Sequence, residues 1–102
     1  MGKTVLKEIK IRLPGDIIET VSNKEIIAML LDKALNKAEY YHSRCKEMEE
    51  RYGMKFASFK KKVDEATKEK FSDWDDFILW EGYVLGYEEW NKKYEELKNC
   101  RG

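Results

Sequence analysis

The segment that decides the fold is residues 22–53, SNKEIIAMLLDKALNKAEYYHSRCKEMEERYG. Ser22 and Glu25 match a capping box, in which the serine hydroxyl accepts a hydrogen bond from the backbone N–H of Glu25 and the glutamate reaches back to Ser22. No Gly or Pro follows until Gly53, which stands where a left-handed C-terminal cap residue belongs. The sequence therefore predicts one helix over residues 24–52, about 44 Å long.

The apolar residues of this helix form a narrow stripe. After a first step of four, their spacing alternates between three and four residues, which is typical of a coiled-coil seam. Ala34 and Ala38 are small enough to let a neighbouring helix approach closely. Ile26, Leu30 and Leu35 widen the apolar face at the N-terminal end, where we expect the strand predicted over residues 4–13 to pack. The stripe consists of Ile27, Leu31, Ala34, Ala38, Tyr41, Cys45, Met48 and Tyr52.

Residues 4–13, on the N-terminal side, have the alternation of a β-strand. No second strand pattern occurs in the chain, and a lone strand leaves its backbone groups unpaired. We therefore expect pairing with the same strand of a second copy across a two-fold axis, in a homodimer or larger oligomer. Pro14 ends the strand, and a short helix follows over residues 15–21. One strand face carries Val5, Ile9, Ile11 and Leu13, interrupted by Lys7, and the other carries Glu8, Lys10 and Arg12.

Two further helices complete a mainly α chain that forms a single domain over residues 1–102. A short helix is predicted over residues 56–66 and a longer one over residues 73–99. Gly82 lies on the side opposite the apolar face of the longer helix and Gly86 at the edge of that face, and each costs about 1 kcal/mol relative to Ala. Close approach of another backbone is one reason for the pair, and a tolerated weakness is the other. The apolar face, within roughly a 160° arc, consists of Phe77, Trp80, Tyr83, Val84, Tyr87, Trp90, Tyr94 and Leu97.

Charge is balanced overall but segregated along the chain. The 102 residues contain 20 basic and 20 acidic side chains, and hydrophobic residues still reach 42%, which favours a packed core over disorder. Residues 1–13 and 55–70 each carry a net charge of +3, whereas residues 14–52 carry −2 and residues 73–99 carry −5. Elements of opposite charge that face each other within one fold or dimer explain this layout. Separate partners for the two ends are the alternative.

Composition also bounds the environment. Abundant Lys and Glu with no Gln and a single Pro is typical of proteins from hot environments. No apolar run is long enough for a membrane span, and no signal peptide is visible, so we expect a cytoplasmic protein. We also expect free thiols at Cys45 and Cys100, because no obvious path of the chain brings them within the roughly 7 Å that a disulfide requires between Cα atoms.

Few residues are arranged for catalysis. His42 and Cys45 supply two ligands where zinc needs at least three, and as a nucleophile pair they lack a third, orienting group. The six glycines are scattered, so no phosphate-binding loop is present. We therefore expect no metal, no cofactor and no enzymatic activity. An enzyme that uses Asp76 and Glu81 is the alternative, since Asp76 lies on the aromatic face; a structural Asp76 would instead bond backbone N–H groups, a lysine or an arginine.

Two stretches carry a resemblance to a known family. KEIKIRLPGDIIETV, residues 7–21, resembles the N-terminal segment of small archaeal and bacterial antitoxins of type II toxin–antitoxin systems, in which a strand ends in Leu-Pro before a short acidic helix. RYGMKFASFKKKV, residues 51–63, and SDWDDFILWEGYVLGYEEWNKKYEEL, residues 72–97, are similar to small archaeal helical proteins for which we infer the same role.

The resemblance implies an N-terminal dimerisation and DNA-binding part and a C-terminal toxin-binding part. It places Lys10 and Arg12 in the first and residues 74–97 in the second. The step from Pro14 to Ser22 is shorter than the first helix of ribbon-helix-helix proteins, in which paired strands enter the DNA major groove. The partner-binding residues would be Trp74, Asp76, Trp80, Tyr83, Tyr87 and Trp90.

The sequence therefore predicts a non-enzymatic, antitoxin-like interaction protein that binds a toxin and, through Lys10 and Arg12, operator DNA. A structural scaffold oligomer with no nucleic-acid role is the alternative, and a small enzyme the third.

Overall fold

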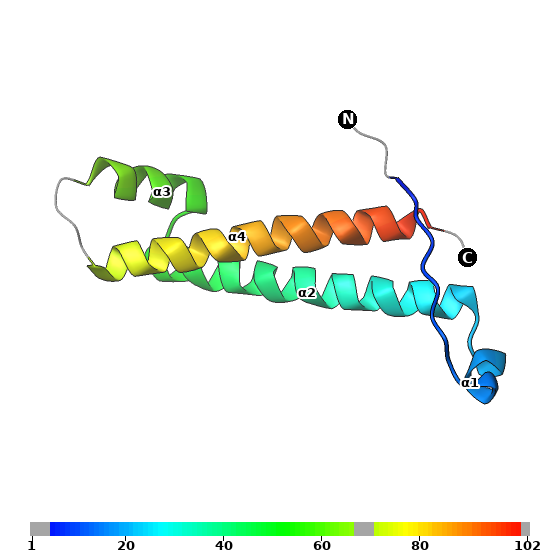
Figure 1. Ribbon diagram of the computed structural model, residues 1–102. Coiled ribbons are helices and arrows are strands. Elements are labelled where there is room, and N and C mark those ends of the chain that lie inside the picture. Colours follow the sequence, from blue (N-terminus) through cyan, green and yellow to red (C-terminus); the bar gives the residue numbers. More distant parts are fainter. Residues whose placement is uncertain (1–4, 67–70, 101–102) are drawn as a thin grey trace.

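The chain is mainly α. The computed structural model describes residues 5–66 and 71–100, the second range without the side chains of residues 71 and 72. Its helices are α1 (Gly15–Thr20), α2 (Asn23–Tyr52), α3 (Phe56–Glu65) and α4 (Phe71–Lys98), shown in Figure 1. All four helices were predicted from the sequence, with bounds that differ by at most two residues. Within the described ranges no residue is in a β-strand.

The ends of α2 follow from its sequence. The Ser22 hydroxyl accepts a hydrogen bond of 3.1 Å from the backbone N–H of Glu25, which satisfies one of the free donors of the first turn. Gly53 adopts a φ of 65° and its N–H donates to the carbonyl of Glu49 at 2.8 Å. Only Gly takes this left-handed conformation without a Cβ penalty, so the helix ends there.

The long helices α2 and α4 form an antiparallel hairpin, and α3 folds back over the end where α2 finishes and α4 begins (Figure 1). The molecule is elongated, with extents of 63 × 30 × 20 Å and a radius of gyration of 19.4 Å. A compact chain of this length has a radius of gyration of about 13 Å. Much of the chain therefore lies outside a single compact core.

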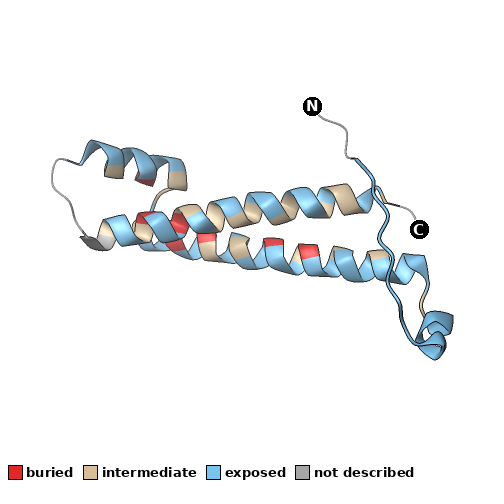
Figure 2. Cartoon of the chain, viewed as in Figure 1, coloured by how far each residue is buried: buried red, intermediate tan, exposed pale blue. Residues whose placement is uncertain are grey.

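The core lies at the α3 end of the hairpin, where most of the residues coloured as buried in Figure 2 gather. Phe59 of α3 and Trp80 of α4 are fully buried, with ring centroids 5.2 Å apart. Cys45 and Met48 of α2 and Phe77 of α4 complete this cluster. The Trp80 indole N–H has no hydrogen-bond partner among the described residues, a cost of about 1–3 kcal/mol that the aromatic packing must offset.

The hairpin continues beyond this core with small residues. Ala34 and Ala38 are buried on α2, as the narrow seam predicted. Gly86 of α4 faces the Tyr41 ring, whose atoms lie 2.9 Å from where a Cβ would be, while Gly82 has open space around it. The close approach expected at the glycine pair is therefore made at Gly86 only, and by a side chain rather than a backbone.

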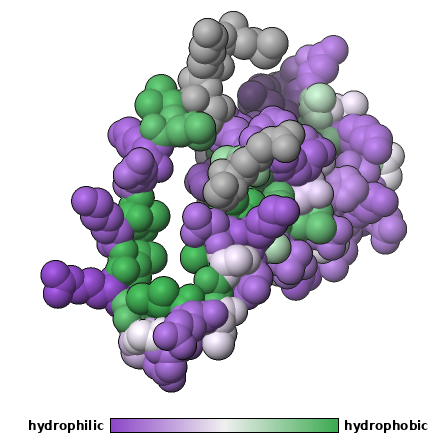
Figure 3. All heavy atoms as spheres, turned by 90° about the vertical axis from the view of Figure 1, so that its right-hand side faces the viewer, coloured by the Kyte–Doolittle hydropathy of each residue, from purple (hydrophilic) through white to green (hydrophobic). Residues whose placement is uncertain are grey.

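Residues 5–14, here called the N-terminal arm, have no regular secondary structure in the single chain. The strand predicted for residues 4–13 is thus not formed within the chain, and Thr4 lies outside the described residues. The arm also does not pack on the N-terminal end of α2 as expected, since Ile26 and Leu30 remain almost half exposed. Figure 3 shows an open gap between the arm and the hairpin. The reason is that every other described element is helical and offers no strand edge to the arm.

Candidate interaction surfaces

The arm carries the most exposed hydrophobic side chains of the described chain. Ile9 and Ile11 share the apolar face of the alternating sequence, yet no other described element covers this face, and they are 82% and 64% exposed. Hydrophobic surface runs along the arm toward α1 in Figure 3. We call the following set the arm surface: Val5, Leu6, Ile9, Ile11, Leu13, Ile17, Ile18, Ile26, Met29 and Leu30. Contiguous exposed apolar patches of this kind mark interaction sites on folded proteins.

A hollow of about 350 Å³ lies between α2 and α4 on the same side of the molecule. Leu30, Trp90 and Leu97 contribute its apolar walls, and Lys33 and Lys93 flank it. A second hollow, lined by Leu6 of the arm, continues past the C-terminal end of α4. The arm surface therefore includes open space as well as exposed side chains.

Lys10 and Arg12, the predicted DNA-binding residues, lie on the exposed arm. Neither forms an ion pair with another described residue. In Figure 3, hydrophilic side chains project outward from the arm, away from the gap. Both charges are thus available to a ligand.

The aromatic face of α4 packs mostly against the chain itself. Trp80 is fully buried, so this predicted partner-binding residue is not accessible to a partner in the folded chain. Tyr83 and Tyr87 are partly buried against α2, with ring centroids 6.5 Å from Tyr41 and 5.2 Å from His42 respectively. Trp90 is also partly buried, beneath the ammonium groups of Lys33 and Lys93 at 5.9 and 5.3 Å from the ring centroid. Trp74 alone among the predicted partner-binding aromatics is exposed.

Asp76 joins α4 to the end of α2. Its carboxylate accepts hydrogen bonds from the Tyr52 hydroxyl and, at 3.4 Å, from Nη1 of Arg51. Burial, and then the bond to Asp76, raise the pKa of Tyr52 to about 12. Asp76 therefore has the structural role that the sequence analysis offered as an alternative to catalysis, with an arginine as one of its partners. Glu81 points about 140° away from Asp76 around the helix, so the two carboxylates are poorly placed for joint acid–base work.

The cysteines are both free. Cys45 is buried in the core, and burial followed by the charge of Glu49 raises the pKa of its thiol, which favours the unreactive protonated form. Cys100 lines the hollow beside Ala34, which is about 16 Å along α2 from Cys45, too far for a disulfide. His42 packs on Tyr87, and no group of three or more metal-ligating side chains occurs within residues 5–66 and 71–100.

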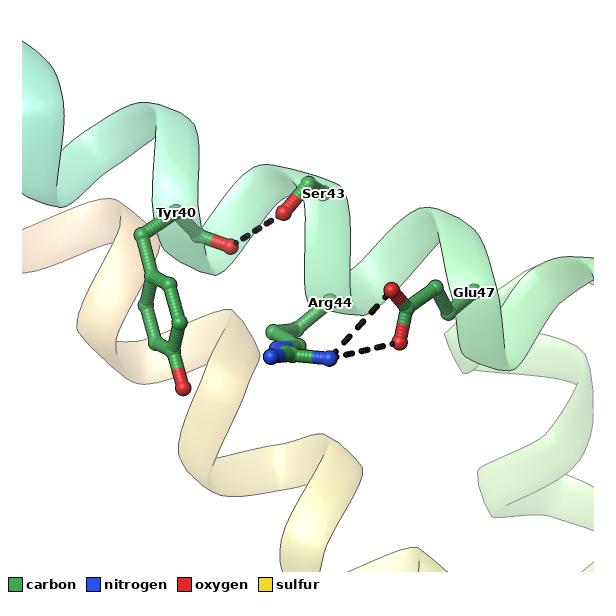
Figure 4. A network of polar contacts seen from close by, with 4 residues as sticks. All are labelled: Tyr40, Ser43, Arg44 and Glu47. Atoms are coloured by element: carbon green, nitrogen blue, oxygen red, sulfur yellow. Dashed lines mark hydrogen bonds and ion pairs between the residues drawn. The ribbon is translucent and has the colours of Figure 1, made fainter.

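A polar network on the outer side of α2 is structural (Figure 4). The Arg44 guanidinium lies 5.2 Å from the Tyr40 ring centroid and forms an ion pair of 3.0 Å with Glu47. The Ser43 hydroxyl donates to the Tyr40 carbonyl at 2.7 Å. All these partners are three or four residues apart on one helix, which is the ordinary spacing for side chains that support a solvated helix face.

A second exposed apolar stripe lies on α4, away from α2. Ile78 and Leu85 are 52% and 58% exposed, and Trp74 and Leu79 are about half exposed. Trp74, Ile78, Gly82 and Leu85 lie along one side of the helix and form what we call the α4 outer face, whereas Leu79 lies about 100° round the helix from Ile78. Sequence reasoning concentrated on the aromatic arc and missed this face, although Trp74, Ile78, Gly82 and Leu85 follow a helical spacing of four, four and three.

No protein-family model matches the chain, and neither a curated protein nor a solved structure shows significant similarity to it. None of the helices within the described ranges has the length and hydropathy needed to cross a bilayer.

Proposed function

We propose that the chain is a non-catalytic interaction module that dimerises through its N-terminal arm and presents the helical hairpin to a second protein. The observation that carries the proposal is the arm itself, where large apolar side chains alternate with charges on a backbone that has no ladder partner within the described chain. Two arms paired antiparallel would satisfy each other's backbone groups and gather their apolar faces toward the hollow between α2 and α4.

Surface area supports association. The chain exposes 8841 Å², whereas a compact monomer of 12.2 kDa exposes about 6,100 Å². The excess is larger than the roughly 1,200–2,000 Å² that a standard protein interface buries. An arm-mediated dimer would therefore remove much of the apolar surface that the elongated monomer leaves in water.

The antitoxin-like role rests on the resemblance of residues 7–21, 51–63 and 72–97. In this role the paired arms would carry four basic side chains, Lys10 and Arg12 from each copy, toward operator DNA, and α4 would face the toxin. A scaffold oligomer without a nucleic-acid role is the second candidate, and the zero net charge favours it because no long-range field attracts DNA. The engagement of Asp76 by Tyr52 and Arg51 argues against the enzyme alternative.

Light scattering at micromolar concentration tests the dimer. We expect a mass of about 24 kDa, twice the 12.2 kDa of one chain, or more. An Ile9→Asp, Ile11→Asp double variant should fall to the monomer mass, because two buried charges at the paired face cost several kcal/mol. Lys10→Ala, on the opposite face of the same segment, is the matched control and should leave the mass unchanged. A wild-type mass near 12 kDa would overturn the proposal.

A further inference from the structure

The α4 outer face has the form of a helix-docking surface. Ile78, Gly82 and Leu85 fall within about 60° of arc at 100° per residue, with Trp74 beside them. Nothing lies within 4 Å of where a Cβ at Gly82 would stand, so no part of the described chain covers the middle of the stripe. A small residue flanked by large apolar ones lets a second helix pack at the short end of the usual 8–10 Å range between helix axes.

Acidic side chains border this stripe. Asp75, Glu81 and Glu88 form no ion pair with another described residue, whereas Glu89 is paired with Lys93 at 3.0 Å. Buried hydrophobic contact at the stripe would bring an incoming helix within reach of these carboxylates. Their negative charges therefore favour a partner helix that carries positive charge.

A second copy of this chain is a poor occupant. If two α4 helices packed antiparallel about a two-fold axis at Gly82, Asp75 of each copy would lie opposite Glu89 of the other. In a parallel pair, each of these acids would face its own counterpart. Like charges at a helix interface are unfavourable in both arrangements.

We infer that the α4 outer face binds a cationic amphipathic helix of a different protein, with leucine-like residues along its centre and Lys or Arg on its flanks. This inference rests on the proposed function, because it gives the chemistry of the partner that the hairpin presents itself to. It also assigns the contact to Trp74, Ile78, Gly82 and Leu85 rather than to the aromatic residues buried against α2.

The test uses an 18-residue synthetic helix of Leu, Ala and Lys with its leucines on one face, labelled for fluorescence anisotropy. We expect the full chain to bind it, and the same peptide with Glu in place of Lys to bind at least tenfold more weakly. An Ile78→Glu, Leu85→Glu double variant should also lose at least tenfold in affinity. Tyr40→Glu, at a half-exposed site on α2 outside both the arm surface and the α4 outer face, is the control and should bind as wild type.

Equal binding of the Lys and Glu peptides, or unchanged binding by the Ile78→Glu, Leu85→Glu variant, would overturn the inference. Stronger binding of a peptide copying residues 1–13, lost in the same variant, would overturn it in favour of a second copy's arm. Circular dichroism of each variant shows whether it folds. The mass by light scattering reports separately on the arm, so a monomeric chain that still binds the Lys peptide would contradict the proposed dimer alone.

Discussion

Burial of Tyr52, and then its bond to Asp76, make the chain less stable at alkaline pH. The unfolded tyrosine has a pKa of 10.0, and in the fold the Tyr52 pKa is raised to about 12. The folded state therefore holds its proton where the unfolded state has lost it, so this contribution is complete below pH 10 and lost between about pH 10 and 12.

We expect the free energy of unfolding to fall across this interval by about 1–3 kcal/mol more in the wild type than in Tyr52→Phe. Urea titrations followed by circular dichroism at pH 9, 10, 11 and 12 measure the difference. Every other titratable group is present in both proteins, so the comparison isolates Tyr52. If the free energy of unfolding falls equally with pH in the two proteins, the fold does not raise the pKa of Tyr52.

The two glycines of α4 give a matched pair of substitutions. Gly82→Ala adds a methyl group in open space and should stabilise the chain by about 1 kcal/mol through helix propensity. Gly86→Ala gains the same propensity, but its Cβ would stand 2.9 Å from the Tyr41 ring, which is itself packed near Tyr83. Overpacking costs about 1–3 kcal/mol, so the net change should be neutral or destabilising.

Thermal and urea unfolding of both variants, in the same buffer, give the comparison. Equal stabilisation by the two alanines would mean that Tyr41 moves aside freely and that Gly86 is only a tolerated weakness.

At the scale of elements, α3 is attached to the hairpin by Phe59, with Phe56 and Val63 packed beside it against the same core. Phe59 is the only fully buried residue of α3, and it lies against both Tyr52 and Trp80. Phe59→Ala should therefore cost about 3–5 kcal/mol. It should also shift the tryptophan emission maximum to longer wavelength, because the Trp80 ring becomes exposed to water.

Lys61→Ala, two residues further on the exposed side of α3, is the control and should change neither quantity appreciably. A Phe59→Ala protein with wild-type stability would show that α3 is not part of the cooperative fold.

The sequence predicted those elements whose signals are local. The bounds of α2 are set by Ser22 and Gly53, each of which acts on backbone groups within one helical turn. The strand predicted for residues 4–13 depends on a distant signal, an edge to pair with, and no other described element offers one. The aromatic arc of α4 correctly indicated a buried face, but the arc alone does not say whether α2 or another protein covers it. The cluster of Cys45, Met48 and Phe59 around Trp80, with Tyr83 packed against it, shows that these two aromatics belong to the fold.

At the scale of the whole molecule, opposite charges lie at different places rather than cancelling locally. The arm carries Lys10 and Arg12, whereas α4 is acidic and its C-terminal end lies beside Leu6 of the same arm. Phosphate contacts by the arm release counterions and favour DNA binding, but the nearby carboxylates oppose it, and a net charge of zero supplies no long-range attraction.

We therefore expect no tight binding of random duplex DNA by the isolated protein at about 0.1 M salt. The Debye length is then about 10 Å, so the α4 carboxylates near the arm still repel a bound phosphate. Fluorescence anisotropy with a random duplex measures this. Specific binding should require the cognate operator, and should strengthen when a cationic partner neutralises α4. If random DNA is bound tightly and a Lys10→Ala, Arg12→Ala variant loses the binding, the arm charges outweigh the acidic helix and the arm alone is the DNA-binding element. Tight binding that survives in that variant would place the nucleic-acid contact on another basic segment, with the lysines of α3 the next to be tested.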